Sequence, residues 1–175
     1  KVIIVSTPTI EGASPIWKLW EEGTRYEWSW PCPECGQYFV PRFELLRWPD
    51  KATPAVALRE SKLACPHCGT LIDDSHRAAM NDAGVFVAPG QTVSPEGEIL
   101  GDPPDTDTAS FWVSGLASPW RSWGQRAKAF LAATRSGEPG RVQGVVNTAL
   151  GELYRVAGDA PPWEGVLDLR ESYVS

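Results

Sequence analysis

The sequence predicts an α+β fold, in which a small β-rich module is inserted between an N-terminal α/β strand-helix piece and a C-terminal strand plus helical pair. Three observations predict it. All four cysteines of the 175-residue chain stand in two matching pentapeptides, at 32–36 and 65–69. The segments around them are short and aromatic and alternate between apolar and polar residues, which is typical of strands. Residues 122–150 instead carry apolar side chains at helical spacing.

The N-terminal run Lys1–Val5 is rich in β-branched residues and predicts a buried parallel strand. It ends in a hydroxyl-rich loop that contains Ser6, Thr7 and Thr9. In open α/β sheets, ligands gather at the carboxyl ends of strands. Hydroxyl groups at strand ends also cap turns without binding a ligand. On the residues alone, both interpretations of the loop stay open.

A short helix follows the loop, with Ser14 as its N-cap, Pro15 at its first position and Gly23 at its end. An aromatic strand over 26–30 then leads into the first cysteine pair. The elements expected next are a strand at 37–40, an apolar segment at 43–48, a helix or loop at 51–61, a helix at 73–81 and a strand at 84–87.

The two cysteine pentapeptides read C-P-E-C-G from Cys32 and C-P-H-C-G from Cys65. Two residues between paired cysteines let one tight turn supply two thiolates to a tetrahedral ion. The final glycine permits a left-handed backbone that turns an amide N–H toward a sulfur, and the proline fixes φ. The spacing therefore predicts one four-thiolate metal site, with the ligands Cys32, Cys35, Cys65 and Cys68.

Disulfides and iron are the alternatives to zinc at this site. Disulfide scaffolds are usually small and cysteine-dense, whereas this chain has four cysteines in 175 residues. The pattern also resembles rubredoxin, in which an iron in a four-cysteine site carries electrons. Rubredoxins are much shorter and place an aromatic residue directly after the first Gly, where this chain has Gln37. We therefore expect a structural zinc in a zinc-ribbon module.

The aromatic and histidine residues near the cysteines have two possible roles. The tryptophans could stack on nucleic-acid bases, but aromatics beside a metal site more often cover it, so we expect them in the core. His67 stands between two ligands, yet four thiolates already fill the site, so we expect it to be exposed.

The C-terminal half begins with a turn-rich stretch at 89–109, which predicts a flexible surface loop. The further predictions are a strand at 110–116, helices at 122–134 and 141–150 separated by glycines at 137–140, and a linker tail from 160. The chain is thus expected to divide into five units: 1–25, the end of an α/β core; 26–82, the ribbon; 83–109, a strand and loop; 110–157, a strand and two helices; and 158–175, a linker.

Charge and hydropathy exclude several classes of protein. The net charge is −6, so no global basic field attracts nucleic acid. Residues 28–80 carry equal numbers of acidic and basic side chains, which argues against an autonomous DNA-binding domain. The longest apolar run is far too short to span a membrane, so no membrane partner is expected. Since the chain opens in mid-strand without Met, we expect it to be a piece of a longer protein.

Several motifs in this order resemble one family. They are the Ser-Thr-Pro-Thr loop from Ser6, the two C-P-x-C-G knuckles, the Leu-x-Ser-Pro-Trp run from Leu116 and the Asn-Thr-x-Leu-Gly-Glu run from Asn147. Together they resemble the large terminase subunit of tailed phages, in the lambda-like GpA family. The likeness extends over nearly the whole chain.

The resemblance implies a DNA-packaging motor of virion assembly in the bacterial host cytoplasm, with an N-terminal ATPase joined to an endonuclease that cuts concatemeric DNA. Its implied partners are double-stranded DNA, the small terminase subunit and the portal. In such proteins the Ser-Thr-Pro-Thr loop couples ATP hydrolysis to DNA movement, which assigns that role to Ser6, Thr7 and Thr9.

The sequence also departs from a complete motor. It contains no G-x-x-x-x-G-K-[ST] loop for phosphates and no convergent acidic set for a two-metal nuclease. No catalytic residue is therefore assigned, and ATP and Mg are expected only in the parent protein. The alternatives are a free-standing zinc-ribbon adaptor for DNA or protein and, less favoured, a rubredoxin-like iron electron carrier.

Overall fold

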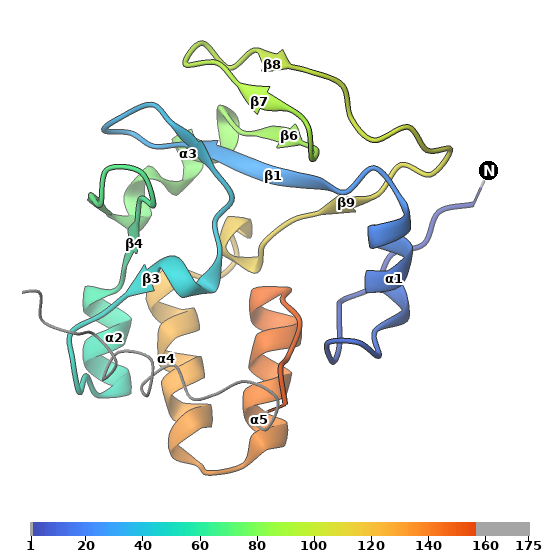
Figure 1. The fold of residues 1–175 in the computed structure, drawn as a ribbon. Coiled ribbons are helices and arrows are strands. Elements are labelled where there is room, and N and C mark those ends of the chain that lie inside the picture. The colour runs from blue at the N-terminus through green and yellow to red at the C-terminus, as the bar shows by residue number, and fades with distance from the viewer. Residues whose placement is uncertain (1, 157–175) are drawn as a thin grey trace, which may run out of the picture.

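Strand β1, Tyr26–Pro31, is the central strand of the largest sheet in the computed structural model, which describes residues 2–156 (Figure 1). It pairs antiparallel with β2 (Tyr38–Phe39) and β6 (Val85–Val87), and parallel with β9 (Phe111–Trp112). Trp30 of β1 is fully buried, and Phe39, its partner across the ladder, is also buried. The strands predicted at 26–30, 37–40 and 84–87 are therefore confirmed; the first extends one residue further, and the other two are shorter than predicted.

A second, antiparallel sheet contains β3 (Leu46–Arg47), β4 (Lys62–Ala64) and β5 (Leu71–Ile72). Leu63 of β4 pairs with Leu46 on one side and Ile72 on the other, and all three side chains are buried. This row of apolar side chains directs one face of the sheet into the core.

The stretch 89–109, predicted as a flexible loop, contains a small antiparallel hairpin. Its strands are β7 (Thr92–Val93) and β8 (Ile99–Leu100), at the top of Figure 1. Similarly, the strand predicted over 110–116 is formed only at β9, because the chain then tightens into a 3₁₀ turn at Gly115–Ala117.

The described chain contains five α-helices: α1 (Pro15–Glu22), α2 (Pro54–Glu60), α3 (Arg77–Asp82), α4 (Trp123–Arg135) and α5 (Pro139–Gly144). Two further 3₁₀ turns, Phe43–Leu45 and Asp74–His76, and a π-helical turn, Val145–Leu150, complete the elements. No helix among residues 2–156 is long and apolar enough to cross a membrane.

Local capping explains where several helices begin. The Thr53 side chain accepts a hydrogen bond from the Val56 N–H at the start of α2. At the start of α4, Ser122 and Gln125 form a reciprocal capping box, which satisfies two N–H groups that would otherwise lack partners. The helices predicted after Ser14 and Ser122 are both confirmed.

The strand predicted at Lys1–Val5 is wrong over its described part. Residues 2–5 form no strand, and Val2, Ile3 and Val5 are 83–88% exposed. A buried parallel strand needs a neighbouring strand and helices over its faces, and no described element provides them here. The first strand-like pairing is a single bridge from Ile10 to Tyr154. The predicted linker at 158–175 lies outside the described residues.

The core joins the sheets to the helices. Trp30 of β1 and Trp123 of α4 are both fully buried, with ring centroids 6.2 Å apart. Helices α2 and α4 approach closely, since a Cβ on Gly124 would lie 2.0 Å from the Leu58 carbonyl oxygen. This packing places both cysteine turns beside one core.

Candidate metal centre

Each cysteine pair forms the turn of an antiparallel hairpin, the first between β1 and β2 and the second between β4 and β5. The two turns have matching hydrogen bonds. Cys32 N–H donates to the Gln37 oxygen at 2.9 Å, and Cys65 N–H donates to the Thr70 oxygen at 2.9 Å. Within each turn, the closing glycine N–H donates to the first cysteine's oxygen, at 2.9 and 3.0 Å.

The glycines that close the two turns have the left-handed backbone predicted for them. Their φ angles are 72° at Gly36 and 76° at Gly69. A side chain at either position would be strained, because L residues rarely adopt this region. The same local geometry is thus built twice, once on each of two different sheets.

The two turns bring all four cysteine sulfurs together. The Sγ atoms lie within 4.8 Å of one another, and the Sγ–Sγ distances from Cys32 to Cys68 and from Cys35 to Cys65 are both 3.8 Å. Four sulfurs at about this spacing suit one tetrahedral ion with Zn–S bonds of about 2.3 Å. Cys32 and Cys65 are buried, whereas Cys68 is exposed. The predicted ligand set is therefore compatible with a metal site.

The surroundings of the sulfurs shift the pKa values of two cysteines in opposite directions. Burial raises the pKa of the Cys32 thiol to about 12. Burial acts in the same direction on Cys65, but the backbone N–H groups of Cys68 and His67, together with neighbouring thiols, outweigh it and lower the pKa of Cys65 to about 7. Amides directed at a sulfur stabilise the thiolate, which is the form that binds a metal.

His67 is exposed, as predicted, and is not part of the sulfur cluster. Its Nε2 atom lies 3.1 Å from the Tyr38 carbonyl oxygen, so it contacts the opposite hairpin. The prediction that the tryptophans lie in the core is confirmed for Trp30, whose Nε1 donates to Asn81 Oδ1 at 2.9 Å. Trp28 Nε1 donates to the same oxygen at 3.2 Å.

Asn81 is a structural residue that sequence reasoning missed. Besides accepting from the two indoles, its Nδ2 donates to the Ala117 oxygen at 2.9 Å. It thereby connects the strand that leads into the first cysteine turn to the segment before α4. No motif in the sequence indicates this role, because a single asparagine in a short helix is unremarkable on its own.

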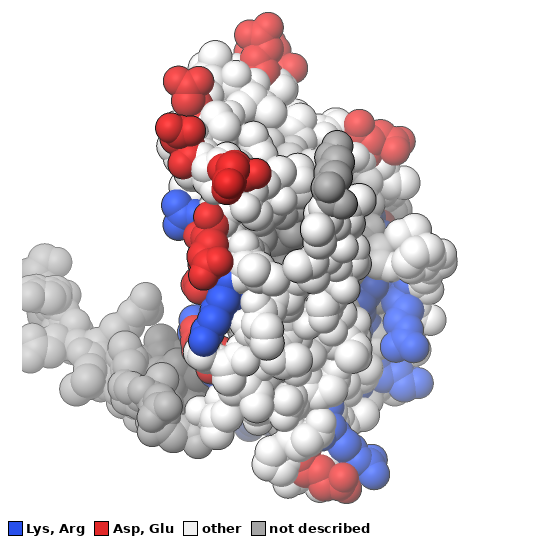
Figure 2. Space-filling model, turned by 90° about the vertical axis from the view of Figure 1, so that its right-hand side faces the viewer, with Lys and Arg blue, Asp and Glu red and all other residues white. Residues whose placement is uncertain are grey.

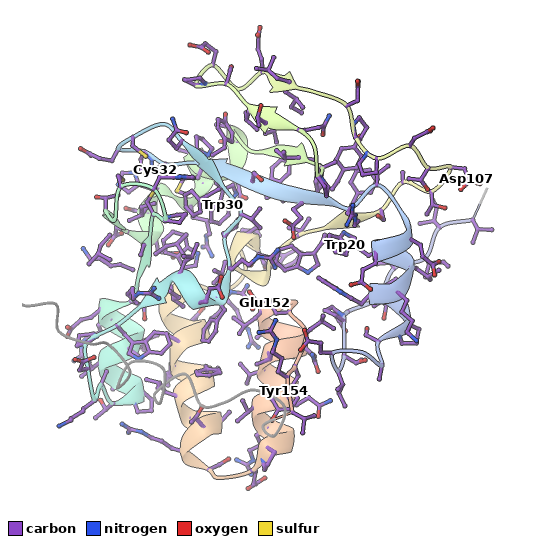
Figure 3. All side chains as sticks on the ribbon, viewed as in Figure 1. Trp20, Trp30, Cys32, Asp107, Glu152 and Tyr154 are labelled. Carbon is purple, nitrogen blue, oxygen red and sulfur yellow. The ribbon has the colours of Figure 1, made fainter. Side chains whose placement is uncertain are left out.

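The Ser-Thr-Pro-Thr loop lies away from the sulfurs. Cys32 and Tyr154, the residue that pairs with the loop's end, are well separated in Figure 3. The side chains of Ser6, Thr7 and Thr9 are exposed. The structure thus brings the four cysteines together but does not bring the loop to them.

The backbone of Thr9 is fixed on both sides. Its N–H donates to Ser14 Oγ at 3.2 Å. Its carbonyl oxygen accepts from Asn147 Nδ2 at 2.7 Å and from the Tyr154 N–H at 2.9 Å. Asn147 is buried, and its Nδ2 also donates to the Glu152 carbonyl oxygen at 2.9 Å.

Glu152 connects this C-terminal run to the segment between the cysteine pairs. Its Oε1 accepts from the Phe43 N–H at 2.7 Å. Burial raises its pKa, against the Phe43 hydrogen bond and the attraction of Arg42, which act to lower it. The Asn-Thr-x-Leu-Gly-Glu run is visible in the sequence, but the contacts of its first and last residues are not.

Two family models match the chain. One is the phage terminase large subunit gpA ATPase domain, over residues 1–86, and the other is the terminase large subunit gpA endonuclease domain, over residues 108–175. Only residues 87–107 lie between the two matches. The chain belongs to the gpA family of phage terminase large subunits. No curated protein and no solved structure matches it.

The two matches show which domain of the terminase each of these contacting residues belongs to. The four cysteines and Thr9 lie within the ATPase-domain match, whereas Asn147, Glu152 and Tyr154 lie within the endonuclease-domain match. The hydrogen bonds of Thr9 and Phe43 therefore join the two matched regions directly. The family resemblance stated from the motifs is confirmed.

Proposed function

We propose that this chain is a central part of a terminase large subunit that uses ATP to move double-stranded DNA and cuts it endonucleolytically, with a structural zinc held by the four cysteines. The observation that carries the proposal is the succession of ATPase-domain and endonuclease-domain matches along one chain. In this role its partners are DNA, the small terminase subunit and the portal, in the bacterial host cytoplasm.

The donor set supports zinc as a structural ion. Four thiolates in tetrahedral arrangement suit zinc or iron, and four protein ligands leave no open position for a substrate. The residue after the first knuckle, Gln37, favours zinc over a rubredoxin-like iron. One ion would cross-link the β1–β2 hairpin to the β4–β5 hairpin, which belong to different sheets. In this proposal residues 26–82 are a zinc-ribbon module.

The remaining units follow from the same assignment. Residues 1–25 end the ATPase core, and 83–109 separate it from the strand and helices at 110–157. Residues 158–175 would lead, within the endonuclease-domain match, into the rest of the nuclease. The sequence has no phosphate loop, so ATP and Mg would bind to other parts of the parent protein. The Ser-Thr-Pro-Thr loop would couple ATP hydrolysis to DNA movement through the hydroxyls of Ser6, Thr7 and Thr9, whose side chains are all exposed.

A terminase that contains Thr7→Ala tests this role in coupling. Loss of a hydroxyl that changes hydrogen bonds when the γ-phosphate leaves should uncouple hydrolysis from movement. We expect DNA packaging in vitro to fall while ATP hydrolysis persists. Thr134→Ala, an exposed threonine on α4, is the matched control. Unchanged packaging by the Thr7 variant would reject the assignment.

A free-standing ribbon adaptor would instead bind duplex DNA tightly through its own surface. Figure 2 shows no continuous basic field on the face it presents. Acidic side chains gather toward the end where β7 and β8 lie, and basic ones lie in separate groups along both edges. Tight, steeply salt-dependent duplex binding by the isolated chain would favour the adaptor over the terminase role.

A further inference from the structure

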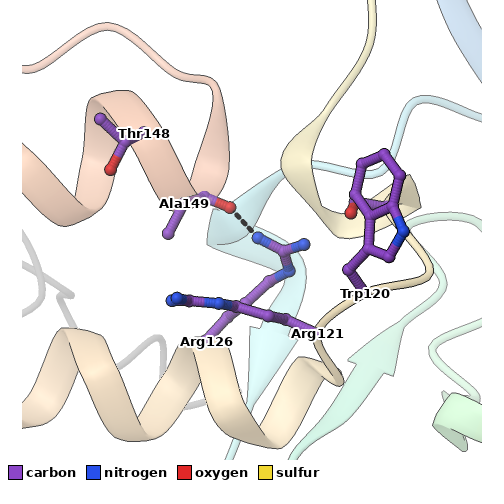
Figure 4. Close-up of a pocket in the computed structure, with 6 residues that line it drawn as sticks. Trp120, Arg121, Arg126, Thr148 and Ala149 are labelled. Carbon is purple, nitrogen blue, oxygen red and sulfur yellow. Dashed lines mark hydrogen bonds between the residues drawn. The ribbon is translucent and has the colours of Figure 1, made fainter.

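A pocket of about 330 Å³ opens between the turn before α4, α4 itself and the π-helical turn (Figure 4). It lies within the endonuclease-domain match and apart from the cysteine cluster. The residues that line it are Ser118, Trp120, Arg121, Arg126, Thr148 and Ala149. Two of them are arginines, which makes the pocket a local basic site on an acidic chain.

Arg126 is buried in this pocket, and no carboxylate of the described residues pairs with it. Only 4% of its surface is exposed, and Nη1 donates to the Ala149 carbonyl oxygen. Within residues 2–156, its Nε has no hydrogen-bond partner, and neither Arg126 nor Arg121 forms an ion pair with a carboxylate. A buried charge is costly unless it is paired and hydrogen-bonded. The guanidinium therefore has donor capacity that an anion would use.

The charge of Arg126 persists at neutral pH. Burial, followed by repulsion from Arg77 and Arg121, lowers its pKa to about 10, with Asp74 acting weakly in the opposite direction. Since this pKa is well above 7, the guanidinium remains protonated. Three positive groups thus lie near one another, and Asp74 is paired with Arg77 at 3.6 Å.

The rim of the pocket is held in place by Arg77. Its Nη1 donates to the Ser118 oxygen at 2.8 Å and to the Arg121 oxygen at 2.6 Å. Trp120, between these two residues, is 89% exposed. Figure 4 shows the Arg126 guanidinium between the Trp120 indole and the turn that carries Ala149. An indole presented in this way offers a large apolar face beside two cationic groups.

We propose that this pocket binds a phosphate group of a nucleotide, held by Arg121 and Arg126, while the attached base stacks on Trp120. Guanidinium groups match phosphate oxygens in geometry and charge, and exposed aromatic rings stack on bases of any sequence. A carboxylate would satisfy the arginines but leave the indole unused. The choice of a nucleotide over other phosphates rests on the proposed function, and the nucleotide is either free or part of a DNA strand.

Fluorescence anisotropy of a labelled short single-stranded oligonucleotide tests the proposal, with AMP, inorganic phosphate and duplex DNA as competitors. Arg126→Gln removes the buried cation, but it also removes the bond to Ala149. Arg121→Gln therefore serves as the second variant, because Arg121 is exposed and its fold contact is made by its backbone. Lys128→Gln, an exposed cation on α4 that does not line the pocket, is the matched control.

We expect Arg121→Gln to weaken binding and to reduce the slope of log affinity against log salt by about one, with no such change for Lys128→Gln. Trp120→Ala should weaken binding of the oligonucleotide and AMP but not of inorganic phosphate. A strand that binds more tightly than AMP identifies nucleic acid as the source of the phosphate, and equal affinities identify a free nucleotide.

Two results would overturn the proposal. One is that the wild-type chain and the Arg121 and Trp120 variants bind the oligonucleotide equally well, or that none of them binds it. The other is binding of inorganic phosphate with no preference for AMP or the strand. Failure of the proposed function would appear separately, in the zinc content of the chain and in DNA packaging by the parent terminase.

Discussion

At the scale of single residues, Glu152 is the most informative side chain outside the cysteines. It accepts a hydrogen bond from the Phe43 N–H and lies near Arg42, but its burial raises its pKa above the ordinary 4.5. The folded state therefore binds this proton more tightly than the unfolded chain does. As pH rises from about 4.5 through the folded pKa, the charged carboxylate lowers the free energy of unfolding, and the loss is complete above that pKa.

Glu152→Gln should remove this pH dependence. Glutamine keeps an Oε1 acceptor for Phe43 but carries no charge, so the variant should gain stability relative to the wild type as pH rises through that window. Urea unfolding at a series of pH values measures the difference. A difference that stays constant across the window would show that burial of the carboxylate does not control stability.

The roles of residues that belong to a fixed sequence pattern could be predicted from the sequence. The roles of residues whose hydrogen-bond partners are distant in the chain could not. The four cysteines and Gly36 could be predicted because spacing alone prescribes a knuckle. Asn81 and Asn147 could not, since their roles depend on carbonyl groups many residues away, including Ala117 and Thr9. Polar residues of this kind become recognisable only once the chain has folded.

At the scale of elements, the contact between α2 and α4 depends on one glycine. A Cβ on Gly124 would lie 2.0 Å from the Leu58 carbonyl oxygen, which is backbone and cannot rotate away. At Gly144, at the end of α5, no atom of another segment among residues 2–156 lies within 4 Å of the same built position. A side chain therefore cannot be accommodated at Gly124 without movement of the backbone, whereas it can be accommodated at Gly144.

Gly124→Ala should lower the free energy of unfolding by about 1–3 kcal/mol or more, because the helices must separate to admit the methyl group. Gly144→Ala should raise it by about 0.5–1 kcal/mol, because alanine is the better helix former and meets nothing. Chemical denaturation of both variants beside the wild type measures the effects. Equal effects of the two changes would contradict the close approach of α2 and α4.

Helices with complete start signals were predicted well from the sequence, and isolated apolar runs were not. Ser122 with Gln125, and Ser14 with Pro15, carry their boundary chemistry within a few residues. The run Lys1–Val5 carries only strand propensity, and its described part has no described strand beside it to pair with. Likewise, the hairpin of β7 and β8 was not predicted, because each of its strands has only two residues and the Pro and Gly residues around them indicate a loop.

At the scale of the whole molecule, two sets of contacts connect segments distant in sequence. The cysteine cluster brings together hairpins from two sheets. The bonds from Asn147 and Tyr154 to Thr9 join the regions matched by the ATPase and endonuclease models. If the cluster holds zinc, its removal should loosen the two cysteine turns, because the ion would be the link between hairpins that belong to different sheets.

Native mass spectrometry of the purified chain tests whether the four cysteines hold one structural zinc. We expect one zinc ion per chain, loss of that ion in Cys32→Ser and Cys68→Ser, and loss of cooperative folding with it, since structural zinc contributes on the order of 10 kcal/mol. A metal-free Cys32→Ser chain that still unfolds cooperatively would contradict the claim, and bound iron would replace zinc with an electron-transfer site.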